Sequence, residues 1–236
     1  MLAIFKREIK AYFLSAIGYI FLSVFYLFAG YFFYATSIVS NNADLKYVFS
    51  NLLIILIFLL PMLTMKIMSE DKKLKTDQLL LTAPVKLASI VVGKFFAAMV
   101  TLFLGILVTF VYAGILTYFA SGFDWISFLC NVIGTLLLGA ELIAIGIFIS
   151  SLTENQVISA IASCAVMLLL FFMDGISSSI NISFISKALA YISIVEPYQQ
   201  FTYGSFSLPN VVLFLGMTTI FLFLTTRILE KRRWAV

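Results

Sequence analysis

The sequence contains no histidine, two cysteines and four prolines, and only 11% of its 236 residues are charged. Without histidine, the commonest metal ligand and the usual proton carrier at neutral pH are missing. Cys130 and Cys164 lie in separate apolar stretches and lack the C-x-x-C spacing of a metal or redox site. We therefore expect both to be buried apolar residues, and we expect no metal centre and no disulfide in this chain.

The shortage of charge is matched by an excess of apolar residues. They make up 63% of the sequence, and the mean hydropathy is +1.12. A soluble domain has about 25% charged and about 45–50% apolar residues. A membrane-spanning helix needs about 20 apolar residues, so this chain has room for about six or seven crossings and little else. The composition excludes a soluble enzyme, a nucleic-acid-binding module and any large domain outside the membrane.

Apolar runs bounded by charged, proline or glycine residues predict an all-α integral membrane protein with six transmembrane helices. Residues 1–236 then form a single transmembrane domain. The first run is too long for the core of a signal peptide and is expected to remain as a membrane helix. The spans are expected at about 17–39, 49–65, 90–119, 127–151, 157–173 and 209–229.

The basic residues predict the orientation. Thirteen of the 15 lie in residues 1–10, 66–94 and 227–233, which six crossings place on one side of the membrane. Only Lys46 and Lys187 lie on the other side. Lysine and arginine accumulate in cytoplasmic loops, so both termini are expected in the cytoplasm.

Residues 1–15 form an amphipathic pattern before the first span. Leu2, Phe5, Ile9 and Tyr12 recur at helical spacing, while basic residues occupy the other faces. This pattern predicts an interfacial helix that lies on the membrane and attracts anionic headgroups. A plain flanking anchor without a further role has the same sequence signature.

Two loops contain more than a simple connection needs. Residues 66–89 begin with charges of both signs, continue with an apolar cluster at 79–81 and reach Pro84, which is expected to end a helix. A short helix that docks into another protein explains the leucines, and a helix folded back on the membrane surface explains them too. Residues 174–208 form an outer loop that is expected to contain short helices, because structureless loops of this length are uncommon.

Glu141 is the one ionisable residue near the middle of a predicted span. A charge at this depth is costly and is a functional candidate by default. It could line a substrate cavity, bind a cation or accept a hydrogen bond where helices pack closely. The sequence has no G-x-x-x-x-G-K-[ST] phosphate loop and no recognisable catalytic motif, so the chain is not expected to hydrolyse ATP or to be an enzyme.

Three blocks of the sequence resemble the membrane subunit (permease) of ABC-2-type exporters, particularly the gliding-motility-associated branch. The first runs over residues 61–85, from PMLTMK to LLLTAPV, and is followed by Gly93-Lys94. The second is SSLTENQ at 150–156. The third begins with FTYG at 201–204 and ends with LEKRRW at 229–234. Together with the amphipathic N-terminus, the resemblance covers essentially the whole chain.

The resemblance implies a permease-like fold of the ABC-2 (type V exporter) kind and a half-transporter that dimerises with a second copy or a homologue. A separate cytoplasmic ATPase would bind ATP and Mg²⁺, so this chain itself needs no cofactor. Membrane lipids and an accessory extracytoplasmic subunit are further candidate partners, whereas nucleic acid is not expected as a partner. The expected location is the cytoplasmic membrane of a bacterium. The coupling helix would be 70–82, with a second contact at 151–156. The implied contact residues are Glu70, Asp71, Lys72, Lys73, Leu79, Leu80, Thr82, Thr153, Glu154, Asn155 and Gln156.

Two other functions fit the residues. An ATP-independent channel or secondary transporter could use Glu141 on its pathway, although no internal repeat is evident. A membrane scaffold could anchor other proteins and move nothing. Nothing in the sequence selects a substrate.

Overall fold

The computed structural model describes residues 2–40, 42–75, 86–119, 123–179 and 193–233. Every regular element in these residues is helical, as the sequence predicts. The elements are α1 (Leu2–Leu14), α2 (Ala16–Phe33), the π-helical turn η1 (Tyr34–Ile38), α3 (Lys46–Lys73), α5 (Leu87–Phe119), α6 (Trp125–Leu152), α7 (Gln156–Ser179), α9 (Val195–Thr202) and α10 (Leu208–Arg233).

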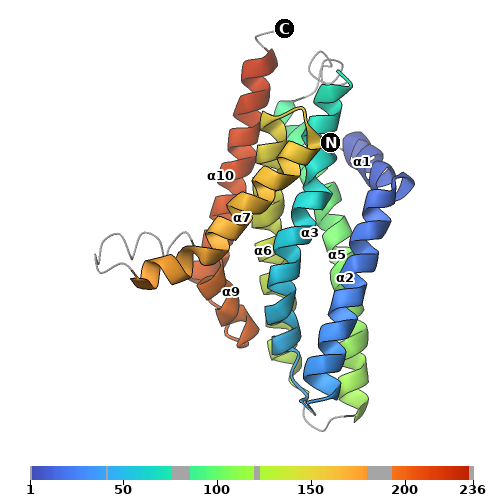
Figure 1. Ribbon diagram of the computed structural model, residues 1–236, viewed down its shortest axis with the longest axis vertical. Helices are drawn as coiled ribbons and strands as arrows, with labels where there is room; N and C mark the ends of the chain where they lie inside the picture. Colours follow the sequence, from blue (N-terminus) through green and yellow to red (C-terminus); the bar gives the residue numbers. More distant parts are fainter. Residues whose placement is uncertain (1, 41, 76–85, 120–122, 180–192, 234–236) are drawn as a thin grey trace.

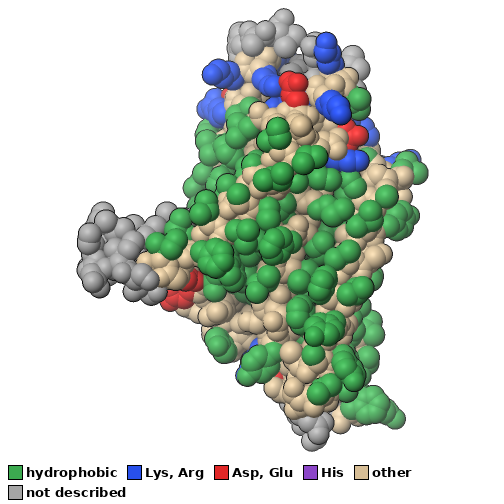
Figure 2. Space-filling model, in the orientation of Figure 1, with side chains coloured by type: hydrophobic (Ala, Val, Ile, Leu, Met, Phe, Trp, Pro, Cys, Tyr) green, Lys and Arg blue, Asp and Glu red, His purple; other side chains and the backbone are tan. Residues whose placement is uncertain are grey.

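Six of these helices are long and apolar enough to cross a membrane, namely α2 together with η1, α3, α5, α6, α7 and α10. They form an elongated bundle, and the shorter α1 and α9 lie beside it (Figure 1). Figure 2 shows apolar side chains along the length of the bundle and charged side chains gathered at one end. Contiguous apolar surface of this extent is rare on soluble proteins. The protein is therefore a multi-pass membrane protein.

Helix α6 is the centre of the bundle. In its most apolar stretch 78% of the residues are buried, against 17% in α10. Gly139 faces the side chain of Leu102 on α5, and Gly146 faces that of Thr64 on α3. A Cβ atom at either glycine would overlap these side chains, so the missing side chains let the helices approach closely. The core is thus built around α6 and its neighbours.

Helix α1 is fixed against the bundle at its junction with α2. Ser15 has extended backbone angles (φ −95°, ψ 156°), which turn the chain between the two helices. The Tyr12 hydroxyl donates a hydrogen bond to the Leu63 carbonyl of α3 at 3.2 Å. Burial is the larger cause, and the charge of Glu8 the smaller one, that raise the pKa of Tyr12 well above its ordinary value. The hydroxyl therefore stays protonated and can donate this hydrogen bond. The N-terminal segment is therefore a helix docked on the bundle, packed mainly against α5 and bonded to α3 through Tyr12.

Helix α3 extends beyond the span expected at 49–65. It continues to Lys73 and includes the first charged residues of the loop expected at 66–89. This extension is stable because Ser69, Asp71 and Lys72 find partners on other helices or in their own backbone. Residues 76–85, and with them Leu79, Leu80 and Thr82, lie outside the described residues.

The outer loop expected at 174–208 is shorter in the structure, because α7 extends to Ser179 and has 24 residues rather than the 17 of the expected span. Short helix α9 lies within this loop. Its Tyr198 is buried, donates to the Phe49 carbonyl at 2.9 Å and lies 3.0 Å from the Thr135 hydroxyl. Tyr198 thereby joins α9 to α3 and α6.

Candidate functional site

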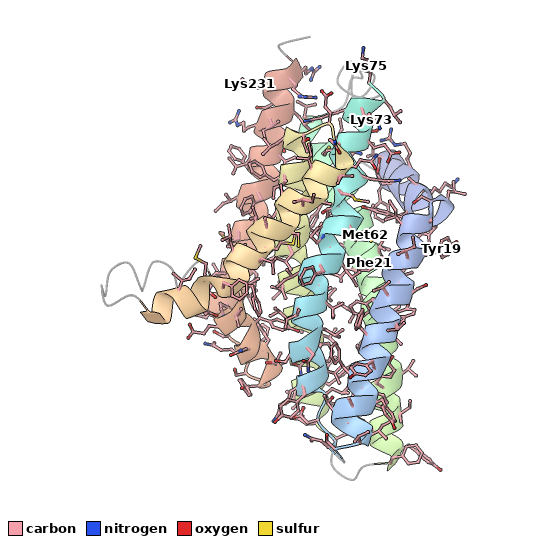
Figure 3. All side chains as sticks on the ribbon, in the orientation of Figure 1. Tyr19, Phe21, Met62, Lys73, Lys75 and Lys231 are labelled. Carbon is pink, nitrogen blue, oxygen red and sulfur yellow. The ribbon has the colours of Figure 1, made fainter. Side chains whose placement is uncertain are left out.

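Charged residues from four helices and one turn meet at one end of the bundle, which we call the charged end. It comprises α1, the last turns of α3, the first two turns of α5, the turn between α6 and α7, and the last turns of α10. Arg7 lies 3.5 Å from Asp71, and Arg232 lies 3.6 Å from Glu154. Figure 3 places Lys73, Lys75 and Lys231 at this same end. Segments far apart in the sequence thus form one polar surface.

Lys94 is the centre of this end. Its side chain is only 2% exposed, and its Nζ lies 2.6 Å from Asp71 Oδ2 and 3.1 Å from Glu8 Oε1. The ammonium also donates to the Ile67 carbonyl at 2.6 Å. An ion buried this deeply is tolerated only when charge partners and hydrogen bonds replace its lost water. Lys94 therefore holds α1, α3 and α5 together.

Arg7 completes the cluster. Its Nη2 lies 2.6 Å from Glu8 Oε1, so two cations face two carboxylates. Burial lowers the pKa of Arg7, but the hydrogen bond and charge of Glu8 and the charge of Asp71 raise it overall, and the guanidinium stays charged. Sequence reasoning did not assign this cluster. Two signals pointed to it: Lys94 is a lone charge within an apolar helix, and Glu8 is the one acidic residue of α1.

A second set of contacts joins α3 to α6. The Lys72 ammonium donates to the Ser151 carbonyl, and the Lys72 residue is 5% exposed. The Ser150 hydroxyl accepts from the amides of Met68 at 3.2 Å and Ser69 at 3.1 Å, and it donates to the Met65 carbonyl at 3.0 Å. These bonds connect the end of α3 directly to the end of α6.

The turn between α6 and α7 has its own internal structure. The Asn155 amide donates to Thr153 Oγ1 at 3.1 Å, and Asn155 Oδ1 accepts from the Val157 amide at 2.9 Å. Such side-chain bonds satisfy the free amides at the start of a helix. The Glu154 side chain is 67% exposed beside Arg232. The exposed apolar residues around this turn are Leu152, Val157 and Ile158.

The predicted contact residues on α3 have different surroundings. Asp71 and Lys72 face partners inside the protein, whereas Lys73 is exposed and Glu70 is half-buried. The bonds of Lys72 and Ser150 join the end of α3 to Ser150 and Ser151, which directly precede the predicted contact residues at 153–156.

Glu141 lies far from this end. It is fully buried in α6, and within the described part of the chain neither carboxylate oxygen has a hydrogen-bond partner. Seven residues before it, Gly134 faces Phe201 of α9, and seven residues after it, Phe148 packs on Phe221 of α10 with ring centroids 5.6 Å apart. Positions seven apart share a helix face. Glu141 thus lies on the side of α6 that α9 and α10 cover.

Among the residues that the structure describes, no group of acidic or cysteine side chains could hold a metal ion. The two cysteines are free thiols in the structure.

A comparison with protein families matches residues 2–234 to the model described as ABC-2 family transporter protein. The chain belongs to the ABC-2 transporter family. The match is to the family as a whole and does not support the gliding-motility-associated branch. A search of curated proteins found no match. Because it belongs to this family, this ABC-2 protein is a membrane transport component. Members of the family generally pair with an ATPase subunit.

Proposed function

We propose that this chain is the permease subunit of an ABC exporter in the cytoplasmic membrane of a bacterium. The charged end faces the cytoplasm, both termini lie there, and a separate ATPase binds this end. The partner holds ATP and Mg²⁺, and this chain performs no hydrolysis. The observation that carries the proposal is that Lys72 and Ser150 bond the end of α3 to the end of α6, which leads into the turn before α7.

These bonds supply a mechanism for coupling. Residues 70–82 and 151–156 would contact the ATPase, and the bond from the Lys72 ammonium to the Ser151 carbonyl joins the helix ends that lead into them. When ATP closes the ATPase pair, the ends of α3 and α6 are expected to move as one body. Because α6 is the central helix, this motion reaches most of the bundle.

A second copy of the chain, or a homologue, is the expected partner within the membrane. Helices α7 and α10 have only 22% and 17% of their apolar stretches buried. A dimer would cover part of this surface and form a pathway between the copies. The substrate would pass along that interface, and an accessory extracytoplasmic subunit could bind at the opposite end.

Copurification tests the ATPase contact. The double change Leu79→Asp and Leu80→Asp is expected to remove an ATPase from the purified complex while leaving membrane insertion intact. Leu208→Asp is the matched control, because Leu208 is 67% exposed at the start of α10, away from the charged end. Full retention of the ATPase by the double variant would exclude 70–82 as the coupling helix.

Glu141 supports a second candidate function, an ATP-independent channel or secondary transporter. A fully buried carboxylate without a partner in the described residues costs several kcal/mol and is usually kept for a function. Glu141→Gln keeps the shape and removes the charge. If Glu141 lies on the pathway, this variant assembles but does not transport. Unchanged transport would leave Glu141 a packing role.

The energy source separates the two functions. Vesicles that contain the chain alone, with an ion gradient and no ATPase, are expected to show no transport if the chain is an ABC permease. Gradient-driven transport that Glu141→Gln abolishes would favour the second function. A membrane scaffold would transport nothing, either with an ion gradient alone or with an ATPase and ATP present.

A further inference from the structure

A cavity of about 330 Å³ lies between α1 and α3 at the charged end, with Lys94 of α5 among its lining residues. Ala11, Ile17 and Leu74 give it apolar walls, while Lys66 and Glu70 bring charges from α3. A site that combines apolar walls with a few polar groups is typical of a binding pocket. The proposed coupling places Glu70, at the start of 70–82, at the edge of the ATPase contact, but it assigns no ligand to the cavity itself.

Hydrogen bonds and ion pairs within the protein hold the walls of this cavity in place. Tyr12 is bonded to the Leu63 carbonyl on one side, and Lys94 is bonded to Glu8 and Asp71 on the other. The cavity therefore does not depend on a ligand to keep α1 away from α3. A preformed site loses less entropy when its ligand binds.

Two charges that line the cavity have no partner among the residues that the structure describes. Arg7, Lys94, Glu8 and Asp71 neutralise one another. Lys66 and Glu70 also line the cavity, but among the residues that the structure describes, neither side chain has a hydrogen bond or an ion pair. They are four residues apart on α3, so they lie one above the other on the same face. Within the described part of the chain, the cavity thus offers the cation of Lys66 and the anion of Glu70 side by side.

The surroundings of α1 place the cavity at the edge of the apolar belt. Lys6 and Lys10 of α1 are exposed, and Leu14 at the end of the same helix is 86% exposed. Exposed basic residues followed by exposed apolar residues mark the level at which phospholipid headgroups meet acyl chains. A ligand that presents opposite charges at this level is a zwitterionic lipid headgroup.

We propose that this cavity binds the headgroup of a phospholipid with a primary amine, of the phosphatidylethanolamine class, from the leaflet at the charged end. The lipid phosphate pairs with Lys66, and its ammonium donates hydrogen bonds to Glu70. Its glycerol and upper acyl chain lie along Ala11 and Ile17. Choline lipids have no N–H to donate, and anionic lipids leave Glu70 unpaired beside Glu8 and Asp71.

Native mass spectrometry of the purified full-length chain tests this site. Phosphatidylethanolamine, phosphatidylcholine and phosphatidylglycerol with identical acyl chains are added in turn, and the retained lipid is counted. Phosphatidylethanolamine is expected to be retained about tenfold more strongly, the size of one or two charge-assisted hydrogen bonds. Equal retention of the three lipids, or a preference for phosphatidylglycerol, would overturn the proposal.

Variants locate the binding. Glu70→Gln and Lys66→Gln are each expected to remove most of the preference, whereas Lys10→Gln and Glu196→Gln, which lie outside the cavity, retain it. Ala11→Trp fills the cavity without changing any charge and is expected to displace the lipid. If Glu70→Gln and Ala11→Trp both keep the wild-type preference, the lipid does not bind here.

Soluble glycerophosphoethanolamine distinguishes a lipid site from a site for a small solute. It carries the same phosphate and amine but no acyl chains. It is expected to compete with the intact lipid at least tenfold more weakly, because the apolar walls then contribute nothing. Competition at equal concentration would show a solute site and overturn the assignment to a membrane lipid. None of these measurements depends on the ATPase.

Discussion

Lys94 Nζ lies 2.6 Å from Asp71 Oδ2, and this pair joins a buried position of α5 to the end of α3. The same ammonium contacts Glu8 of α1, so one side chain connects three helices. Asp71 was expected to face a partner protein. That contact stays a prediction, and the pairing of Asp71 with Lys94 fixes the position of the helix that leads into the expected coupling segment.

Lys94→Ala is expected to destabilise the protein by about 3–5 kcal/mol, because it removes the buried cation between Glu8 and Asp71 and leaves only the half-exposed Arg7 to balance both carboxylates. Chemical denaturation in detergent, followed by tryptophan fluorescence or circular dichroism, measures the change. Lys10→Ala removes an exposed lysine of α1 and is the control, with a change of at most about 0.5 kcal/mol. Equal stability of the two variants would show that the Lys94 cluster holds nothing together.

Ser150→Ala is expected to separate ATPase binding from transport. The variant loses the hydroxyl that bonds the amides of Met68 and Ser69, at a cost of about 1–3 kcal/mol. The ATPase surface itself is unchanged, so the partner still copurifies, but its motion reaches α6 less efficiently. Transport per ATP hydrolysed, measured in vesicles, is expected to fall severalfold. Ser40→Ala, an exposed position at the end of η1, is the control.

Gly146→Ala is expected to destabilise the bundle by about 1–3 kcal/mol, because the added methyl group overlaps the Thr64 side chain of α3. Gly216→Ala is a closely matched control, since a Cβ atom there meets nothing within 4 Å. Alanine is the better helix former, so the control is expected to be neutral or up to about 1 kcal/mol more stable. Thermal unfolding of both variants in one detergent distinguishes them. Equal melting temperatures would contradict the packing of α6 on α3.

Asp124→Ala is expected to lower stability in a pH-dependent way. Hydrogen bonds from the Ser127 hydroxyl and the Ile126 amide lower the pKa of Asp124 below its ordinary 3.8. A carboxyl with a lowered folded pKa stabilises the protein above its unfolded pKa, and this contribution is lost as pH falls through the folded value. The wild type and the variant therefore differ at neutral pH and converge below about 3.8. Melting temperatures across this range measure the effect, and a constant difference would contradict it.

The all-helical architecture with its six candidate spans was predictable from the sequence, because each span depends on a run of neighbouring apolar residues. The ends of the helices were less predictable. Helix α3 continues to Lys73 because Lys72 reaches the Ser151 carbonyl on another helix, which no local pattern reveals. Leu79, Leu80 and Thr82 stay predicted contacts of a partner ATPase.

By itself, the sequence determined that this is a helical membrane protein, since the transfer of an apolar run into lipid depends on that run alone. The tertiary structure decided what the few charges do. Lys94 meets Glu8 across 86 positions, and Lys72 meets the Ser151 carbonyl across 79. Glu141 has no such partner in the described residues. A buried charge is stable only beside its counterpart, and only the packing of distant helices decides which charges meet.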